Sequence, residues 1–179
     1  MQRRIFLGLM AALPFGGIAR AASAHDFTFE AIEGGPLPMS RFAGRPVLVV
    51  NTASFCGFTP QYTALQALWD RYRDKGLVVL GVPSDDFGGQ EYDSAGQVKE
   101  FCEVNFAIDF PMTDITRVRG DGLHPFYAWA REALGPGSAP SWNFHKYLIG
   151  PDGRAVAAFG TTTRPDAPEL VDAVERLLN

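Results

Sequence analysis

Cys56 is the residue in this sequence best placed to do chemistry. It follows the apolar run Val47–Val50 and precedes Thr59-Pro60, so it stands between the end of a buried strand and the start of a helix. Reactive groups in open α/β sheets gather at the carboxyl ends of strands, and a helix N-terminus favours a thiolate over a thiol. This position predicts a reactive, accessible thiolate. The alternative is a buried, inert cysteine.

The second cysteine, Cys102, lies beside Phe101 on the apolar side of a predicted helix, which predicts a buried thiol. A disulfide with Cys56 would need the two Cα atoms within about 7 Å, so this helix would have to unwind locally. The chain has no C-x-x-C pair for zinc or for a thioredoxin-type dithiol, and its three histidines lack metal-ligand spacing. No metal ion and no cofactor are expected.

The elements that must position these thiols alternate strands and helices. Buried strands are predicted at Val47–Val50 and Leu77–Val82, with a helix between them that begins at Pro60, is capped by Thr59 and ends at Gly76. That order requires two parallel strands joined by a right-handed crossover. A half-buried strand at Phe27–Ile32 opens a hairpin ahead of them.

The rest of the chain predicts two more strands and three more helices. They are expected at Tyr147–Ile149 and Ala155–Phe159, and at Ser94–Val104, Pro125–Leu134 and Leu170–Leu178. Asp166 and Glu169 have capping-box spacing ahead of the final helix. The whole order predicts the thioredoxin-like α/β fold, a central mixed sheet flanked by helices with an N-terminal β-hairpin.

Residues 1–24 are predicted to be an export signal, and 25–179 a single domain. Arg3-Arg4 is followed by an apolar stretch, too short to span a bilayer, and by the small residues Ala22-Ser23-Ala24. The twin arginines ahead of Phe6-Leu7 are similar to a twin-arginine signal, which predicts a periplasmic protein. An ordinary secretory signal is the alternative, and Ala19-Arg20-Ala21 offers a second cleavage site.

Composition excludes several classes of function. The chain has 179 residues, of which 46% are hydrophobic, and a net charge of −4, as expected for one globular domain. Loss of the three signal arginines from sixteen basic residues leaves thirteen against twenty acidic ones, a net charge of −7. Such a domain is not expected to bind nucleic acid or to stay on an anionic membrane.

Four segments of the chain together form a recognisable pattern. They are Asn51–Tyr62, which reads N-T-A-S-F-C-G-F-T-P-Q-Y, and then, in order, Phe87–Glu91, Phe110–Met112 and Trp142–Leu148. The first resembles the peroxidatic loop of the glutathione peroxidase family in its cysteine-containing, non-selenium form. The others are similar to that family's F-G-x-Q-E, F-P-hydrophobic and W-N-F-x-K-[FY]-L segments, in the same order. The resemblance covers essentially all of Asp26–Asn179. It implies a thioredoxin-like fold and an enzyme that reduces hydrogen peroxide or organic hydroperoxides.

The resemblance also implies a catalytic group made of Cys56, Gln90, Trp142 and Asn143. The last three offer N–H donors that would stabilise a thiolate and then a departing oxyanion. Taken singly, each has an ordinary explanation, as core packing for Trp142 and as loop hydrogen bonding for the two amides. Cys56 would be oxidised to a sulfenic acid.

Cys102 lies in F-C-E-V-N-F, which resembles the helix segment where thioredoxin-dependent members carry a resolving cysteine. The implied cycle ends with a Cys56–Cys102 disulfide that a thioredoxin-like dithiol reduces. Alternatives are a structural disulfide or unpaired core thiol at Cys102, a one-cysteine peroxidase that uses glutathione directly, and a redox sensor or relay. A non-enzymatic binding module of the same fold would need every catalytic match to be coincidental.

Two departures from the family pattern add expectations. Asp85-Asp86 stand where the family more often has Asn-Gln, which predicts two carboxylates near the reactive loop. No long insertion of the kind found in tetrameric members lies between Ile115 and Trp142, which favours a monomer.

Overall fold

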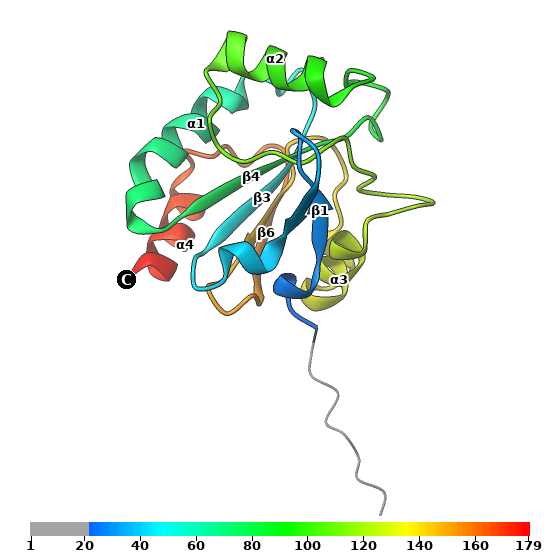
Figure 1. The fold of residues 1–179 in the computed structure, drawn as a ribbon. Helices are drawn as coiled ribbons and strands as arrows, with labels where there is room; N and C mark the ends of the chain where they lie inside the picture. Colours follow the sequence, from blue (N-terminus) through cyan, green and yellow to red (C-terminus); the bar gives the residue numbers. More distant parts are fainter. Residues whose placement is uncertain (1–21) are drawn as a thin grey trace, which may run out of the picture.

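A four-stranded mixed sheet forms the centre of the computed structural model, which describes residues 22–179 (Figure 1). The predicted signal, apart from its last three residues, lies outside the described residues. The strands are β3 (Val47–Thr52), β4 (Val78–Pro83), β5 (Lys146–Ile149) and β6 (Ala155–Phe159), in the order β4-β3-β5-β6. β3 and β4 are parallel, as predicted, whereas β5 and β6 run antiparallel to their neighbours.

The N-terminal hairpin is a separate two-stranded sheet, in which β1 (Thr28–Glu30) pairs with β2 (Pro36–Pro38). β1 is shorter than the predicted strand because the chain already turns at Ala31, whose N–H donates to the Gly35 carbonyl. Gly34 and Gly35 both adopt positive φ angles, 89° and 84°, which favour glycine in this turn.

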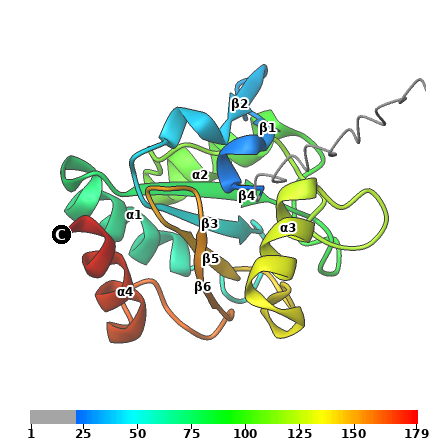
Figure 2. The same ribbon diagram turned by 90° about the horizontal axis from the view of Figure 1, so that it is seen from below.

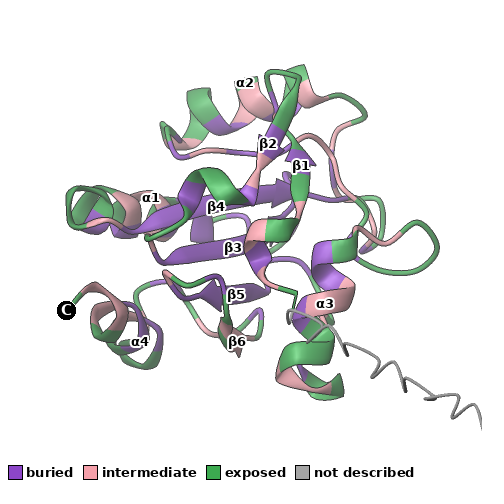
Figure 3. Ribbon diagram, turned by 60° about the horizontal axis from the view of Figure 1, so that its bottom comes forward, coloured by how far each residue is buried: buried purple, intermediate pink, exposed green. Residues whose placement is uncertain are grey.

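The four α-helices cover the sheet on both faces (Figure 2). α1 (Gln61–Tyr72), α2 (Ala95–Phe106) and α4 (Pro168–Leu178) pack with Leu48, Val79 and Leu148 in one apolar cluster. α3 (Pro125–Leu134) and the hairpin pack with the opposite side chains of the same strands, among them Val49 and Leu80. Residues of β3, β4 and β5 are therefore buried on both faces, which explains their continuous apolar runs (Figure 3).

Of the four helix starts predicted from the sequence, two are confirmed and two have no side-chain cap. The Ser94 side chain caps α2, and Pro125 opens α3. Thr59 does not cap α1, because its hydroxyl bonds the backbone at Cys56 and Ala53 instead. Asp166 pairs with Arg164, and α4 begins at Pro168 with Ala167, not Asp166, at its N-cap and no side-chain cap.

Candidate active site

Three segments far apart in the sequence meet at one edge of the sheet. The loops after β3 and β4 leave from the carboxyl ends of parallel strands, and β5 enters at the same edge because it is antiparallel to β3. Backbone bonds join the segments: Phe55 N–H donates to the Gln90 carbonyl (2.9 Å) and Phe144 N–H to the Asn51 carbonyl (2.6 Å). The predicted residues Cys56, Gln90, Trp142 and Asn143 all belong to these segments.

Cys56 lies in a turn that its own neighbours hold in place. The Thr59 hydroxyl accepts a hydrogen bond from Cys56 N–H (3.1 Å) and donates one to the Ala53 carbonyl (2.8 Å). Phe58 N–H, just before α1, donates to Cys56 Sγ at 3.4 Å. The residue is only 6% exposed, while its neighbours Phe55 and Phe58 are exposed. The sulfur is therefore less accessible than its position in the sequence predicted, and it has a backbone donor.

Gln90 and Asn143 are in direct contact. Asn143 Nδ2 donates to Gln90 Oε1 at 3.1 Å, and Asn143 is fully buried. With its oxygen engaged, the Gln90 amide nitrogen is left with N–H groups to offer. The two amides thus form a pair with N–H groups left to donate.

Trp142 directly precedes Asn143 in the chain and is 39% exposed. Its ring lies 5.8 Å from that of Phe87, centroid to centroid, and Asn51 Nδ2 donates to its carbonyl oxygen at 3.1 Å. Among residues 22–179, the Trp142 indole N–H has no hydrogen-bond partner. That donor is free to meet a ligand.

Glu91 is a buried carboxylate that sequence reasoning did not single out. Its Oε1 accepts from the backbone N–H groups of Ser54 (3.3 Å) and Tyr92 (2.9 Å), so it ties the Gln90 loop to the Cys56 loop. Burial raises the pKa of this carboxyl above its usual value, partly offset by those hydrogen bonds. Only its place directly after Gln90 could have signalled this role.

Asp86 is engaged by a segment that follows far later in the chain. Its side chain is nearly buried and accepts from the backbone N–H groups of Val118 (2.6 Å) and Arg119 (3.1 Å) and from the Arg117 guanidinium (3.3 Å). These three donors satisfy its charge, so the carboxylate fixes the segment 117–119. Asp85 is exposed.

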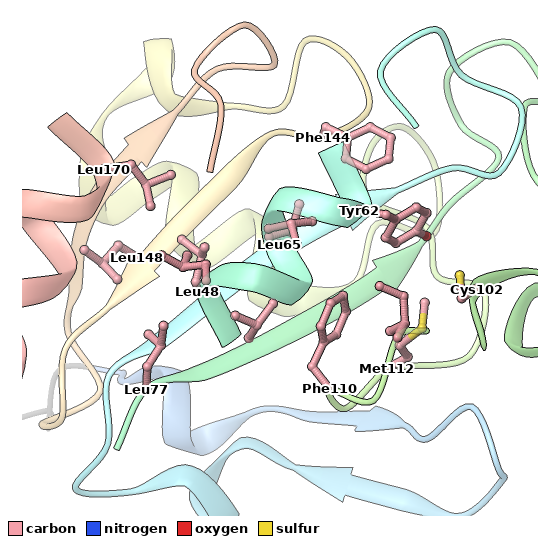
Figure 4. Packing of buried hydrophobic residues seen from close by; sticks show 14 of the residues in the cluster. Leu48, Tyr62, Leu65, Leu77, Cys102, Phe110, Met112, Phe144, Leu148 and Leu170 are labelled. Atoms are coloured by element: carbon pink, nitrogen blue, oxygen red, sulfur yellow. The ribbon is translucent and has the colours of Figure 1, made fainter. Parts of the chain in front are cut away.

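Cys102 is buried, as predicted, with 1% of its surface exposed. It belongs to the same apolar cluster as Cys56, and both cysteines are free thiols. Figure 4 shows Tyr62 between Phe144 and Cys102, and its hydroxyl lies beside this thiol without good hydrogen-bond geometry. Burial raises the pKa of the Cys102 thiol to about 12. In this conformation it is a protonated, unreactive thiol.

An exposed aromatic group connects the Cys56 loop with α2. The ring of Phe55 lies 4.5 Å from that of Tyr92 and 6.3 Å from that of Phe101, which directly precedes Cys102. The two cysteine-bearing segments are therefore neighbours.

Within the described part of the chain, no three His, Cys, Asp or Glu side chains are grouped closely enough to hold a metal ion. Nor does any helix between residues 22 and 179 have the length and apolar character needed to cross a membrane.

Comparison with known proteins identifies the family. The glutathione peroxidase family model matches residues 24–131. A hydroperoxy fatty acid reductase of Synechocystis is 38% identical over 162 residues, covering 86% of this chain and 95% of that protein. A glutathione peroxidase-like peroxiredoxin of Schizosaccharomyces pombe is 39% identical over 149 residues, covering 82% and 92%.

Solved structures agree in fold. The crystal structure of apo Trgpx, 32% identical, superimposes with a TM-score of 0.71 and covers 88% of this chain and 97% of its own. A thioredoxin-family thiol:disulfide interchange protein of Chlorobium tepidum, only 14% identical, reaches 0.64 over 91% of this chain and all of its own, which shows the thioredoxin-like fold alone. The chain is a thiol peroxidase that belongs to the glutathione peroxidase family.

Proposed function

We propose that the chain reduces hydrogen peroxide and organic hydroperoxides, with Cys56 as the nucleophile. The observation that carries this is the placement of Cys56 at the sheet edge where the Gln90–Asn143 pair presents amide donors. The relatives' names, hydroperoxy fatty acid reductase and glutathione peroxidase-like peroxiredoxin, support the same substrate class. Replacement of Cys56 by Ser tests it: peroxide consumption should cease while the fold persists, since a hydroxyl is a far weaker nucleophile near neutral pH.

In the first step the Cys56 thiolate attacks the terminal oxygen of the hydroperoxide. An S–O bond forms, the O–O bond breaks, and the departing alkoxide or hydroxide takes a proton from water to leave as alcohol or water. Cys56 becomes a sulfenic acid. N–H groups of Gln90, Trp142 and Asn143 stabilise the negative charge, first on sulfur and then on the departing oxygen.

In the second step the Cys102 sulfur attacks the Cys56 sulfur. The S–O bond breaks, and hydroxide leaves with the Cys102 proton as water, so that a disulfide remains. The aromatic contact between the Cys56 loop and α2 supports this pairing. Because Cys102 is buried as a protonated thiol, part of α2 must open before the sulfurs meet.

A thioredoxin-like dithiol then reduces the disulfide, returning both thiols and becoming a disulfide itself. Steady-state turnover of the purified chain with peroxide and either thioredoxin, its reductase and NADPH, or glutathione alone, tests this assignment. Turnover with thioredoxin is expected. Full turnover with glutathione alone would favour the one-cysteine mechanism. Oxidation without turnover in either system would favour a sensor or relay.

We further propose that the enzyme is exported through a twin-arginine-type signal and works as a periplasmic monomer. Cleavage after Ala21 fits better than cleavage after Ala24, the site preferred from sequence alone. The Ala24 side chain is fully buried and its N–H donates to the Gly153 carbonyl, while the Trp129 indole donates to the Ala22 carbonyl, both at 2.9 Å. Intact-mass analysis of the secreted protein should find Ala22 first, and light scattering should give the mass of one chain.

A further inference from the structure

Lys146, the first residue of β5, is a lysine with no exposed surface. Its Nζ donates to Gln61 Oε1 and to the Thr163 carbonyl, both at 2.6 Å. Among residues 22–179 no carboxylate forms an ion pair with it. Burying an amine without a carboxylate is unfavourable, and burial lowers the pKa of this amine to about 7. This unfavourable burial indicates that the hydrogen bonds of Lys146 have a role other than packing.

A chain of buried hydrogen bonds leads from Lys146 to the amide pair of the active site. Gln61 Nε2 donates to the Thr161 carbonyl (2.7 Å), and the Thr161 hydroxyl donates to the Asn143 carbonyl (2.8 Å). Asn143 in turn donates to Gln90. All four residues of this chain are buried, so water cannot easily replace their hydrogen bonds. They are Lys146, Gln61, Thr161 and Asn143.

Lys146 holds the oxygen end of the Gln61 amide. Its ammonium donates to that oxygen, while the Thr161 carbonyl, which can only accept, holds the amide nitrogen. An apolar side chain in place of Lys146 would leave the Gln61 oxygen buried without a partner. Lys146 and the Thr161 carbonyl therefore fix Gln61 together, and the chain of hydrogen bonds is complete only with both.

The segment 142–144, which this chain of hydrogen bonds reaches, is under backbone strain. Phe144 has a φ of 60°, in the left-handed region that is unfavourable for residues other than glycine. Asn51 holds the segment from one side, through Phe144 N–H and the Trp142 carbonyl. Thr161 holds it from the other, through the Asn143 carbonyl. A strained turn with two anchors keeps its side chains in place only while both anchors hold.

We propose that Lys146 is a positioning residue of the peroxidase site, which fixes Asn143 through Gln61 and Thr161. The proposal rests on the proposed role of Cys56, because only then does the position of Asn143 affect a rate. Lys146 itself touches no reacting atom in this scheme.

Matched variants of the full chain test this proposal. Thr161→Val removes the hydroxyl and keeps the shape, whereas Thr161→Ser keeps the hydroxyl. The measurement is the second-order rate constant for Cys56 oxidation by hydrogen peroxide in a single turnover. Thr161→Val and Lys146→Met should both lower it about 10-fold or more, and Thr161→Ser should stay within about twofold of the wild type. Equal rates for Thr161→Val and Thr161→Ser would overturn the proposal.

A double-mutant cycle shows whether Lys146 acts through Asn143. In the Asn143→Ala background, Lys146→Met should cause little further loss, because the residue it positions is gone. Losses that simply multiply would mean an independent, structural effect of Lys146 and would overturn the proposal. If Lys146→Met fails to fold, Gln61→Met in the same cycle breaks the same chain one bond further on.

Amide hydrogen exchange provides a readout that does not depend on peroxidase activity. Lys146→Met and Thr161→Val should speed exchange at Phe144 N–H, and Thr161→Ser should not. If wild-type Cys56 did not react with peroxide, the proposed function would fail, yet the exchange pattern would still decide the positioning role. Unchanged exchange at Phe144 in both loss variants would refute it.

Discussion

Asn143 Nδ2 donates to Gln90 Oε1, the side-chain amide oxygen, across 3.1 Å, and this bond joins the turn before β5 to the loop after β4. The bond settles which end of the Gln90 amide is free. Its oxygen is occupied, so its nitrogen remains to donate to sulfur or to a peroxide oxygen. The bond therefore leaves the Gln90 amide nitrogen and the second N–H of Asn143 as the donors that the pair can offer.

Asn143→Asp should therefore be strongly impaired. A carboxylate in place of the amide repels the Gln90 oxygen and puts negative charge where the thiolate and the departing oxygen carry theirs. We expect the rate of sulfenic acid formation to fall roughly 10–1000-fold. Trapping with a sulfenic-acid-specific label measures that rate. Asn179→Asp, the same change of charge at the chain end, is the matched control and should react like the wild type.

Trp142→Phe removes the indole N–H and keeps most of the ring that packs against Phe87. Because that N–H has no partner among residues 22–179, its loss should leave stability nearly unchanged. The first oxidation step should slow by about 10-fold or more if the indole supports the developing charge. An unchanged rate of sulfenic acid formation would reduce Trp142 to a packing residue.

The sequence predicted the position of Cys56 well, because the strand before it and the helix after it are both local patterns. It could not reveal the contact between Gln90 and Asn143, since that bond depends on β5 entering the sheet at the same edge. Thr59 was misread because capping rules ignore competing partners such as the Ala53 carbonyl. Lys146 passed unnoticed because a lysine at a strand end is ordinarily solvent-exposed.

Thr59 is expected to matter through the turn it holds and not through α1. Thr59→Val leaves the Cys56 N–H and the Ala53 carbonyl buried without partners, which should cost about 1–3 kcal/mol for each group. Urea denaturation should show a lower free energy of unfolding, and oxidation of Cys56 should slow. Thr59→Ser keeps the hydroxyl and should restore both. A Thr59→Val protein of wild-type stability would assign the turn to other contacts.

The buried thiol of Cys102 predicts a specific pH dependence. Its pKa is raised to about 12 in the folded chain from an ordinary 9.0. The raised pKa therefore adds to the free energy of unfolding in full below pH 9. This contribution is lost as the pH rises from 9 toward 12, because the unfolded chain then releases the Cys102 proton more readily than the folded chain does. Relative to Cys102→Ala, wild-type stability should fall by about 1 kcal/mol per pH unit over the first part of that range. Parallel curves would contradict the raised pKa.

Cys102→Ser separates the two chemical steps. The variant should still react once with peroxide, since Cys56 and its donors remain, and then stop, because a thioredoxin-like dithiol attacks a disulfide that it cannot form. Under excess peroxide its mass should rise by about 32 Da as the sulfinic acid forms, whereas the wild type should lose about 2 Da. Normal thioredoxin-supported turnover by the variant would rule out the resolving role.

The same role requires a change in α2 of the oxidised wild type. At the C-terminal end of α2, the Cys102 carbonyl accepts a hydrogen bond from Ile108 N–H at 3.3 Å. The helix ends at Phe106, and Ala107, with a φ of 52°, is its C-cap. We expect that helix end to open when Cys102 bridges to Cys56, since its thiol is buried and a disulfide needs close Cα atoms. Amide exchange at residues 100–108 should therefore be faster in the disulfide form than in the reduced form. In Cys102→Ser, peroxide should leave exchange there unchanged, and equal exchange in both wild-type forms would mean that Cys102 stays in place.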